Sequence, residues 1–254
     1  MIPGQAQQFF EAAAAQSGGG DVEVLRSLRF NSGDTAYLNR TPSSATNVDT
    51  WTWSGWVKRS KLGQHTDMFS GVQNGQNATI IQFDNNDQLD FENFVGNSSQ
   101  GRKITNMLFR DTSAWYHIVV AYDSTNSTAD DRVKLYVNGS QITSFSYSEN
   151  PGSGQDTIIN SGNPHYVGSD KGFNNHYFDG YLANVQFIDG QQLAASDFGQ
   201  YDSNNVWQPK AYSGSYGTNG FYLKFDDNSS DAALGTDSSG NNNTWTVNNL
   251  DKNH

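Results

Sequence analysis

Apolar and polar residues alternate in two runs between residues 114 and 139, and these runs flank a polar segment rich in Ser, Thr, Asn and Asp. In the second run Val133, Leu135 and Val137 share one parity, and the residues between them are Lys and Tyr. Alternation at a period of two is typical of a strand that turns one face towards a core. Asn138 and Gly139 follow, and both accept the positive φ angles of a tight turn. The pattern predicts a β-hairpin.

The first run carries bulky side chains on both faces. One parity holds Trp115, His117, Val119 and Ala121, and the other holds Tyr116, Ile118, Val120 and Tyr122. A strand of this kind is expected in the centre of a packed sheet. The segment 51–58 is similar, because Trp51, Trp53 and Val57 share a parity and Trp56 takes the other. We expect the first three in the core and Trp56 on the opposite face.

Further short apolar runs separated by turn residues predict a succession of strands. These strands are expected at residues 24–30, 36–39, 51–58, 79–83, 88–94, 104–109, 141–147, 165–168, 180–188 and 221–225, with a last one at 244–247. One short helix is expected at 194–198. Residues 204–217 have no clear period, and we expect them to wrap the edge of a sandwich.

The first 22 residues differ from the rest. Residues 5–16 include four consecutive Ala and can form a short helix, which the three Gly at 18–20 would end. Such a helix is marginal alone, so Phe9 and Phe10 favour docking on a neighbouring subunit. The alternative is a disordered terminus. We therefore expect an N-terminal arm over residues 1–22 and one β-sandwich over residues 23–254.

The composition of the 254 residues agrees with an all-β fold. The chain has 15 Phe, 12 Tyr, 6 Trp and 25 Gly, and only 16% of its residues are charged. These values favour a sandwich or a barrel over a helical protein. The chain has no Cys, which excludes disulfides and thiolate metal sites and fits a reducing compartment.

The net charge of −11 disfavours nucleic acid as a partner, because it repels phosphates and no basic run offsets it. The N-terminal segment lacks the basic and long apolar regions of a secretory signal. No apolar run reaches the length of a membrane span, so we expect no membrane insertion.

Three segments together resemble the laminin-G-like, concanavalin A-like jelly roll: residues 27–40, the hairpin at 114–139, and residues 177–198. Residues 50–63, 206–221 and 234–249 are similar to the version found in predicted structural proteins of marine tailed phages. The resemblance implies a two-sheet antiparallel sandwich in a virion component. A single module with a short arm suits a capsid-decorating knob or a small tail or fiber adhesin.

Some sandwich relatives are glucanases, which resemble one another in a Glu-x-Asp-x-Glu strand. This chain has Gln88, Asp90 and Glu92 at that spacing. An amide at the first position cannot act as the nucleophile of a retaining mechanism. We therefore expect no catalysis and interpret these residues as a solvated acidic strand face. The chain also lacks a catalytic thiol, a Gly-x-Ser-x-Gly motif and a phosphate-binding Gly loop.

Two kinds of metal ligand come into consideration. Among the histidines, His117 is expected to be a buried core residue, while His165 and His176 lie near predicted turns and could pair in space. Laminin-G-like relatives often hold calcium with carboxylates and carbonyls. The calcium candidates are Asp123, Asp130 and Asp131 on the hairpin, with Asp34 and Asp179 near the matched segments. Acidic turn chemistry is the favoured alternative.

A glycan site needs exposed aromatic rings flanked by amides and carboxylates. The segment 169–180 has that composition, and its candidate residues are Phe173, Asn174, Asn175, His176 and Tyr177. We expect the neighbouring Phe178 to pack inward. The alternative is that these loop aromatics only cap one end of the sandwich.

The sequence therefore predicts a non-enzymatic surface protein of a bacteriophage virion, assembled in the host cytoplasm. Its arm would contact other virion subunits, and a homo-oligomer or array would present the module to host-surface glycans with avidity. The alternative is a free carbohydrate-binding lectin that could depend on calcium. A glycosidase is the third class of function.

Overall fold

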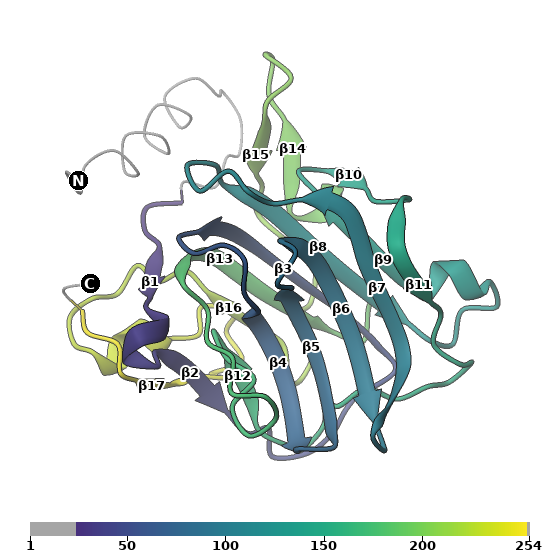
Figure 1. The fold of residues 1–254 in the computed structure, drawn as a ribbon. Helices are drawn as coiled ribbons and strands as arrows, with labels where there is room; N and C mark the ends of the chain where they lie inside the picture. Colours follow the sequence, from purple (N-terminus) through teal and green to yellow (C-terminus); the bar gives the residue numbers. More distant parts are fainter. Residues whose placement is uncertain (1–23, 253–254) are drawn as a thin grey trace.

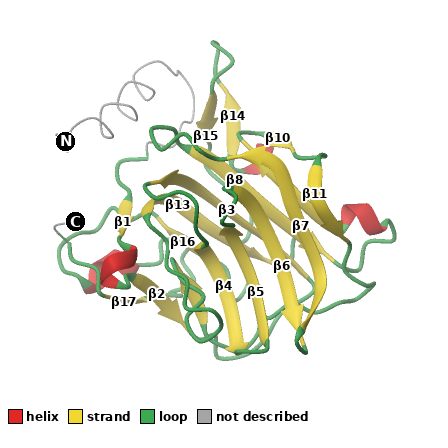
Figure 2. Cartoon of the chain, in the orientation of Figure 1, coloured by secondary structure: helices red, strands yellow, loops and turns green. Residues whose placement is uncertain are grey.

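The computed structural model describes residues 24–252, which form two antiparallel sheets packed face to face (Figure 1). The predicted all-β sandwich is confirmed. Helices are limited to short 3-10 turns within the described residues, as Figure 2 shows in red. These turns are η1 (Ser32–Asp34), η2 (Ala129–Asp131), η3 (Ala195–Asp197) and η4 (Ala232–Gly235).

One sheet has seven strands in the order β1-β13-β3-β8-β9-β10, with β16 also paired to β13. The strands are β1 (Leu28–Phe30), β3 (Thr50–Arg59), β8 (Tyr116–Asp123), β9 (Val133–Val137), β10 (Ser140–Gln141), β13 (Gly180–Asp189) and β16 (Phe221–Leu223). The long strands β3, β8 and β13 lie side by side at its centre, as the bulk on both faces of β8 predicts.

The other sheet has eight strands in the order β11-β7-β6-β5-β4-β12-β2-β17. The strands are β2 (Tyr37–Arg40), β4 (Thr66–Asn74), β5 (Asn77–Phe83), β6 (Gln88–Val95), β7 (Ser98–Leu108), β11 (Phe145–Glu149), β12 (His165–Val167) and β17 (Thr246–Asn248). Segments near the two ends of the described chain meet here, because β17 pairs with β2.

The main core lies between the sheets and is rich in aromatic side chains. Trp51, Trp53 and Val57 are fully buried in it, whereas Trp56 belongs to a separate cluster on the outer face of the seven-stranded sheet. The parity prediction for β3 is therefore confirmed. Fully buried aromatic side chains of the core also include Phe30, Phe69, Phe83, Phe91, Phe109, Tyr122 and Phe178.

The hairpin of β8 and β9 and its following turn are also confirmed. Val133, Leu135 and Val137 face the core, and Asn138 (φ 47°) and Gly139 (φ 84°) form the turn into β10. A Cβ on Gly139 would lie 2.5 Å from the Trp207 ring, so this glycine is required both by its backbone angle and by close packing.

Three local predictions differ from the structure. Strand β4 was not predicted, because its Thr, Asp, Ser and Gly residues interrupt the apolar alternation. The strand expected at 141–147 is divided into β10 and β11. The expectation that residues 204–217 wrap the edge of the sandwich is wrong. They instead contribute β15 (Trp207–Pro209), which pairs with β14 (Gly199–Tyr201) and brings Trp207, Tyr212 and Tyr216 onto the outer face of the seven-stranded sheet.

The predicted arm, with its helix at 5–16 and with Phe9 and Phe10, lies outside the described residues and stays a prediction. Across residues 24–252, no helix has the length and apolar character needed to cross a membrane.

Candidate functional site

The outer face of the eight-stranded sheet carries rows of polar and apolar side chains that point away from the core. This arrangement results from the alternation of side chains along each strand, because Ile81, Phe83 and Phe91 turn inward and their neighbours turn outward. The outward rows that run across the sheet are Asp67, Gln82 and Asp90, then Ser70, Ile80, Glu92 and Arg102, then Val72, Ala78 and Phe94. A charged half of the face therefore adjoins an apolar half.

Arg102 holds the charged half together. Its guanidinium donates to both oxygens of Asp90, at 3.1 and 2.7 Å, and lies 3.4 Å from Glu92. Gln82 donates to Asp90 at 3.1 Å and is in turn bonded to the His65 ring at 3.0 Å. Burial raises the pKa of Asp90 and of Glu92, and the Arg102 charge opposes that shift in both. The network is fixed in place and only partly exposed.

The structure corrects the interpretation of Gln88, Asp90 and Glu92 as a solvated acidic face. Asp90 is fully buried beneath Arg102, and Glu92 is partly buried. The pairing register shifts between Gln88 and Asp90, and the Gln88 amide donates to the Thr105 carbonyl instead of joining the network.

The loop that joins β12 to β13 lies over this face. Asp170 anchors it by accepting the backbone N–H groups of Asn174 at 3.2 Å and His176 at 2.6 Å. Asn175 adopts a left-handed backbone angle (φ 60°), which Asn tolerates well. Phe178 packs into the core against Phe30, as predicted.

The five predicted glycan residues therefore come together in one loop. Phe173 packs on Phe94 at 5.4 Å, above the apolar half of the face, and Tyr177 lies 6.2 Å from Tyr37. Asn174 and Asn175 are exposed, and Phe173, His176 and Tyr177 are half-buried. This placement gives aromatic rings and amides on one surface, and their binding of glycan stays a prediction.

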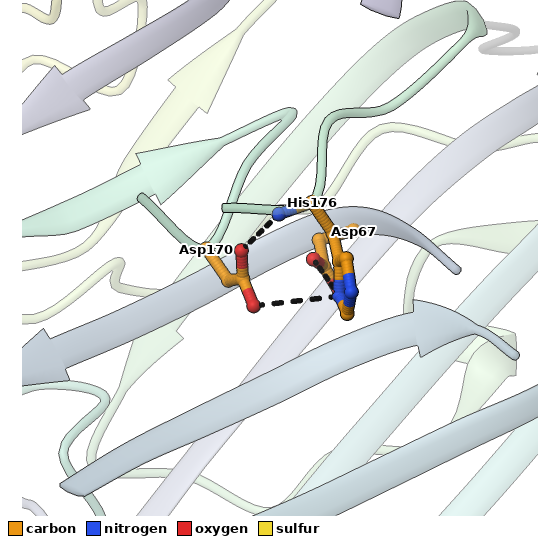
Figure 3. Close-up of side chains that lie close together, drawn as sticks. All are labelled: Asp67, Asp170 and His176. Carbon is orange, nitrogen blue, oxygen red and sulfur yellow. Dashed lines mark hydrogen bonds and ion pairs between the residues drawn. The ribbon is translucent and has the colours of Figure 1, made fainter. Parts of the chain in front are cut away.

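A second group of polar side chains lies where this loop meets β4. Asp67, Asp170 and His176 point towards one another (Figure 3), and Nδ1 of His176 lies 3.5 Å from Asp67 Oδ2 and 3.6 Å from Asp170 Oδ2. Both carboxylates are fully buried. Burial and the neighbouring Asp170 carboxyl raise the pKa of Asp67 well above its usual range. Of residues 24–252, these three form a group whose geometry could hold a metal ion.

Two residues of this polar group and its surroundings, His65 and Asp67, were not identified from the sequence. The His65 ring stacks on the His176 ring at 4.9 Å and 10° between planes, so His176 pairs with His65 and not with His165 as considered above. Asp67 and Asp170 are about a hundred positions apart in sequence and share no motif spacing. The sequence carried no local signal for their contact.

The calcium candidates of the hairpin do not form such a group within the described chain. Asp123 accepts the backbone N–H and the hydroxyl of Thr125, in a local turn. Asp130 accepts the Asn150 amide, and Asp131 pairs with Lys134 at 3.2 Å. These contacts are those of the alternative, acidic turn chemistry.

The two acids near the matched segments have similar roles. Asp34 accepts the Asn31 amide, and Asp179 accepts the backbone N–H and the hydroxyl of Ser32. Both stabilise the short η1 turn beside β1.

His117 and His165 are buried structural residues. The Trp207 indole donates to Nδ1 of His117 at 3.0 Å, and Nε2 of His117 bonds Ser54 Oγ at 2.9 Å. Burial lowers the pKa of His117 to about 3 and that of His165 to about 4. The prediction that His117 is a core histidine is confirmed.

Comparisons with known proteins agree with this architecture. A family model described as the concanavalin A-like lectin/glucanases superfamily matches residues 31–197, which include the whole charged network and the loop above it. A search of curated protein sequences gives no match.

Several solved structures are similar. A putative carbohydrate binding protein from Bacteroides ovatus is 16% identical with a TM-score of 0.55, and the match covers 87% of this chain and 57% of that protein. A heptameric SAP-like pentraxin from Limulus polyphemus is 20% identical (TM-score 0.49; 66% and 77% covered). The enzymatically active domain of tailspike protein 2 from bacteriophage CBA120 is 13% identical (TM-score 0.48; 71% and 28% covered). At these identities the likeness concerns the fold alone.

Proposed function

Because this chain belongs to the concanavalin A-like lectin/glucanases superfamily, we propose that it is a non-enzymatic glycan-binding module. Its binding surface is the outer face of the eight-stranded sheet together with the loop that joins β12 to β13. One observation carries the proposal: an aromatic ring, exposed amides and a fixed carboxylate-guanidinium network adjoin on this face, while the opposite outer face is covered by the chain itself.

The arrangement matches the two kinds of surface that a sugar presents. The C–H face of a pyranose packs on an aromatic ring, and Phe173 lies half-exposed above Phe94. The hydroxyl groups need fixed donors and acceptors, which Glu92 and Arg102 provide in the next row of the same face. Both partners are held in place before the ligand arrives, which limits the entropy cost of binding.

The charge of the surface favours neutral glycans. Asp90 and Glu92 outnumber the single guanidinium of Arg102 in the network, and the chain as a whole has a net charge of −11. A sialylated or sulfated glycan would be repelled. A neutral glycan, rich in hydroxyl groups, is therefore the ligand class that we assign to the site.

The hydrogen bonds of Asp90 support the proposal that the module is not an enzyme. Both of its oxygens accept bonds from Arg102, and one also accepts from Gln82, so the carboxylate is engaged and fully buried. A nucleophile or base must be free to approach the anomeric centre. We expect no glycoside turnover by the wild-type chain. Turnover that the Glu92→Gln variant abolishes would contradict this.

A glycan array with the full chain tests the binding site. We expect neutral glycans to bind, and we expect Phe173→Ala and Asn174→Ala to weaken binding by about tenfold, the effect of losing about 1.4 kcal/mol of contact. The matched control is Tyr201→Ala, which removes a half-exposed aromatic ring from β14 on the other side of the molecule.

Circular dichroism of each variant verifies that it is folded. Equal binding by wild type and Phe173→Ala, or loss of binding in Tyr201→Ala, would contradict the assignment. Repeating the array with a calcium chelator distinguishes a calcium-dependent lectin from a calcium-independent one.

We also propose that the module is displayed in many copies on the virion of a tailed bacteriophage, as a capsid knob or as a tail or fiber adhesin. The support is the resemblance of residues 50–63, 206–221 and 234–249 to phage structural proteins. Residues 1–22 would contact other virion subunits, and the array would turn weak glycan contacts into avidity. Deleting residues 1–22 should leave a folded chain that is not incorporated into particles. Normal incorporation of the deletion variant would contradict this role.

A further inference from the structure

The carboxylate of Asp67 is buried without a donor to bond it. Its side chain is fully inaccessible, and neither oxygen has a hydrogen-bond partner within residues 24–252. Nδ1 of His176, which faces it, also lacks one. An unpaired buried charge is costly, so such groups are normally neutralised by a proton, by a counter-charge or by a metal ion. Asp67 and His176 Nδ1 therefore face each other and Asp170, which is itself bonded by two backbone N–H groups.

The surrounding structure holds these three side chains in position. The pairing register of β4 with β5 shifts between Asp67 and Phe69, a bulge that turns Asp67 outward while Phe69 stays in the core. Asp170 is fixed by two backbone N–H groups of its own loop. The ring of His176 is fixed by stacking on His65. Supporting contacts of this kind are typical of ligand side chains.

We propose that Asp67, Asp170 and His176 bind a divalent transition-metal cation of the Zn²⁺ class. Zinc ligands lie about 2.0 to 2.2 Å from the metal in a tetrahedral arrangement, which separates neighbouring ligand atoms by about 3.3 to 3.6 Å. The two separations from His176 Nδ1, 3.5 and 3.6 Å, fall in this interval. The third pair, between the two carboxylates, lies within 4.8 Å.

The ligand set selects this class of metal over calcium. Calcium requires six to eight oxygen ligands, whereas this site offers two carboxylates and one imidazole nitrogen. Imidazole suits zinc and its neighbours among the transition metals. Two carboxylates would also balance the charge of a divalent ion.

The fourth position of the metal would face the outside of the molecule. His176 is 31% exposed, whereas the two carboxylates beneath it are fully buried, so the open side of the group is the side of the loop. A zinc site with three protein ligands and one open position accepts water or an oxygen of a bound molecule. The site lies on the proposed glycan surface, but zinc binding does not require that glycan binds there.

Calorimetric titration of the full chain tests the proposal, after treatment with a chelator and with zinc chloride as the probe. We expect one zinc ion per chain. The variants Asp67→Asn and His176→Gln should each lose affinity by about tenfold or more, since the loss of even an outer-shell partner commonly has that effect. The matched control is Asp130→Asn, a carboxylate on the hairpin far from this loop in sequence, which should bind zinc like the wild type.

A second measurement uses the wild type alone, so it does not depend on the folding of a variant. X-ray absorption of the zinc-loaded wild type should show one imidazole nitrogen with oxygen neighbours. Zinc that binds Asp67→Asn as tightly as the wild type would overturn the proposal. So would the absence of a stoichiometric site, which would leave a proton shared between the two carboxyl groups as the partner of Asp67.

Discussion

The outer face of the seven-stranded sheet is covered by the chain, whereas the outer face of the eight-stranded sheet carries a charged network. On the first, Trp207 of β15 packs over Val119 and beside Trp56, and its indole bonds His117. On the second, Arg102 stays partly exposed above the buried Asp90, and the β12–β13 loop and His65 lie beside this network.

The difference shows that the sandwich fold requires apolar packing only between the inner faces of its two sheets. Packing the two inner faces of a sandwich builds the core, and each outer face can then be closed or left polar. This chain closes one face with a second aromatic layer and fixes charged groups on the other. A face that is held rigid but not covered is suited to contact with a ligand.

The largest effect is expected from Arg102→Met, which tests whether the charged face is built around its ion pair. The variant leaves Asp90 buried without its cation, and removing one partner of a buried pair typically costs about 3 to 5 kcal/mol. Urea unfolding of the variant and the wild type measures the free energy of unfolding.

The double variant Arg102→Met with Asp90→Asn is the control, because it removes the unpaired charge. We expect it to recover most of the lost stability. A cost below about 1 kcal/mol for the single variant would instead match an ordinary exposed pair, and the contrast between the two faces would then be much weaker.

Trp207→Ala tests the covered face, with a somewhat smaller effect. The substitution removes the ring that links two apolar clusters and the donor to His117, and we expect a loss of about 3 kcal/mol, at the lower end for buried aromatic residues because Trp207 is partly exposed. Binding of a hydrophobic dye should increase as the sheet becomes exposed.

Tyr201→Ala on the neighbouring strand is the matched control for this change, because its ring is half-exposed. Its expected cost is below about 1 kcal/mol. Similar losses in the two variants would mean that Trp207 does not act as the cover of this face.

Much of this contrast could be predicted from local sequence patterns. The apolar residues at both parities of β8 indicate a sheet face that needs a cover, and the structure provides one. The source of the cover could not be predicted, because residues 204–217 have no period and gain their structure from packing on the sheet. Tertiary contacts override weak local propensity in such segments.

Only part of the candidate site could be predicted from local sequence patterns. Residues 173–177 could be proposed as glycan ligands from the sequence because their composition is local to one loop, and their role stays a prediction. Asp67 was missed because β4 contains polar and Gly residues that break the alternation, and because its partners Asp170 and His176 come from a distant loop. Asp90 was expected to be solvated, since a pattern of alternation reports the face of a side chain but not what lies above it.

The smallest expected effect is a difference in pH dependence between the two faces. The pKa of His117, on the covered face, is about 3 in the folded chain, below its ordinary value of about 6.5 in the unfolded chain. As the pH falls below 6.5 the unfolded state binds the proton first, so stability declines by up to about 1.4 kcal/mol per pH unit. Burial raises the pKa of Glu92, on the charged face, so its contribution is fully present below about pH 4.5 and is lost as the pH rises.

Urea unfolding at pH 7.5, 6.0 and 5.0 measures both slopes. His117→Gln keeps an acceptor for Trp207 and should reduce the decline on acidification, although His165, with a pKa of about 4, retains part of it. Glu92→Gln removes the opposite dependence and should steepen the decline slightly. Because the two histidines are closed to solvent and Glu92 is not, the His117 effect should be the larger. Parallel profiles for His117→Gln and the wild type would show that the covered face does not exclude the proton.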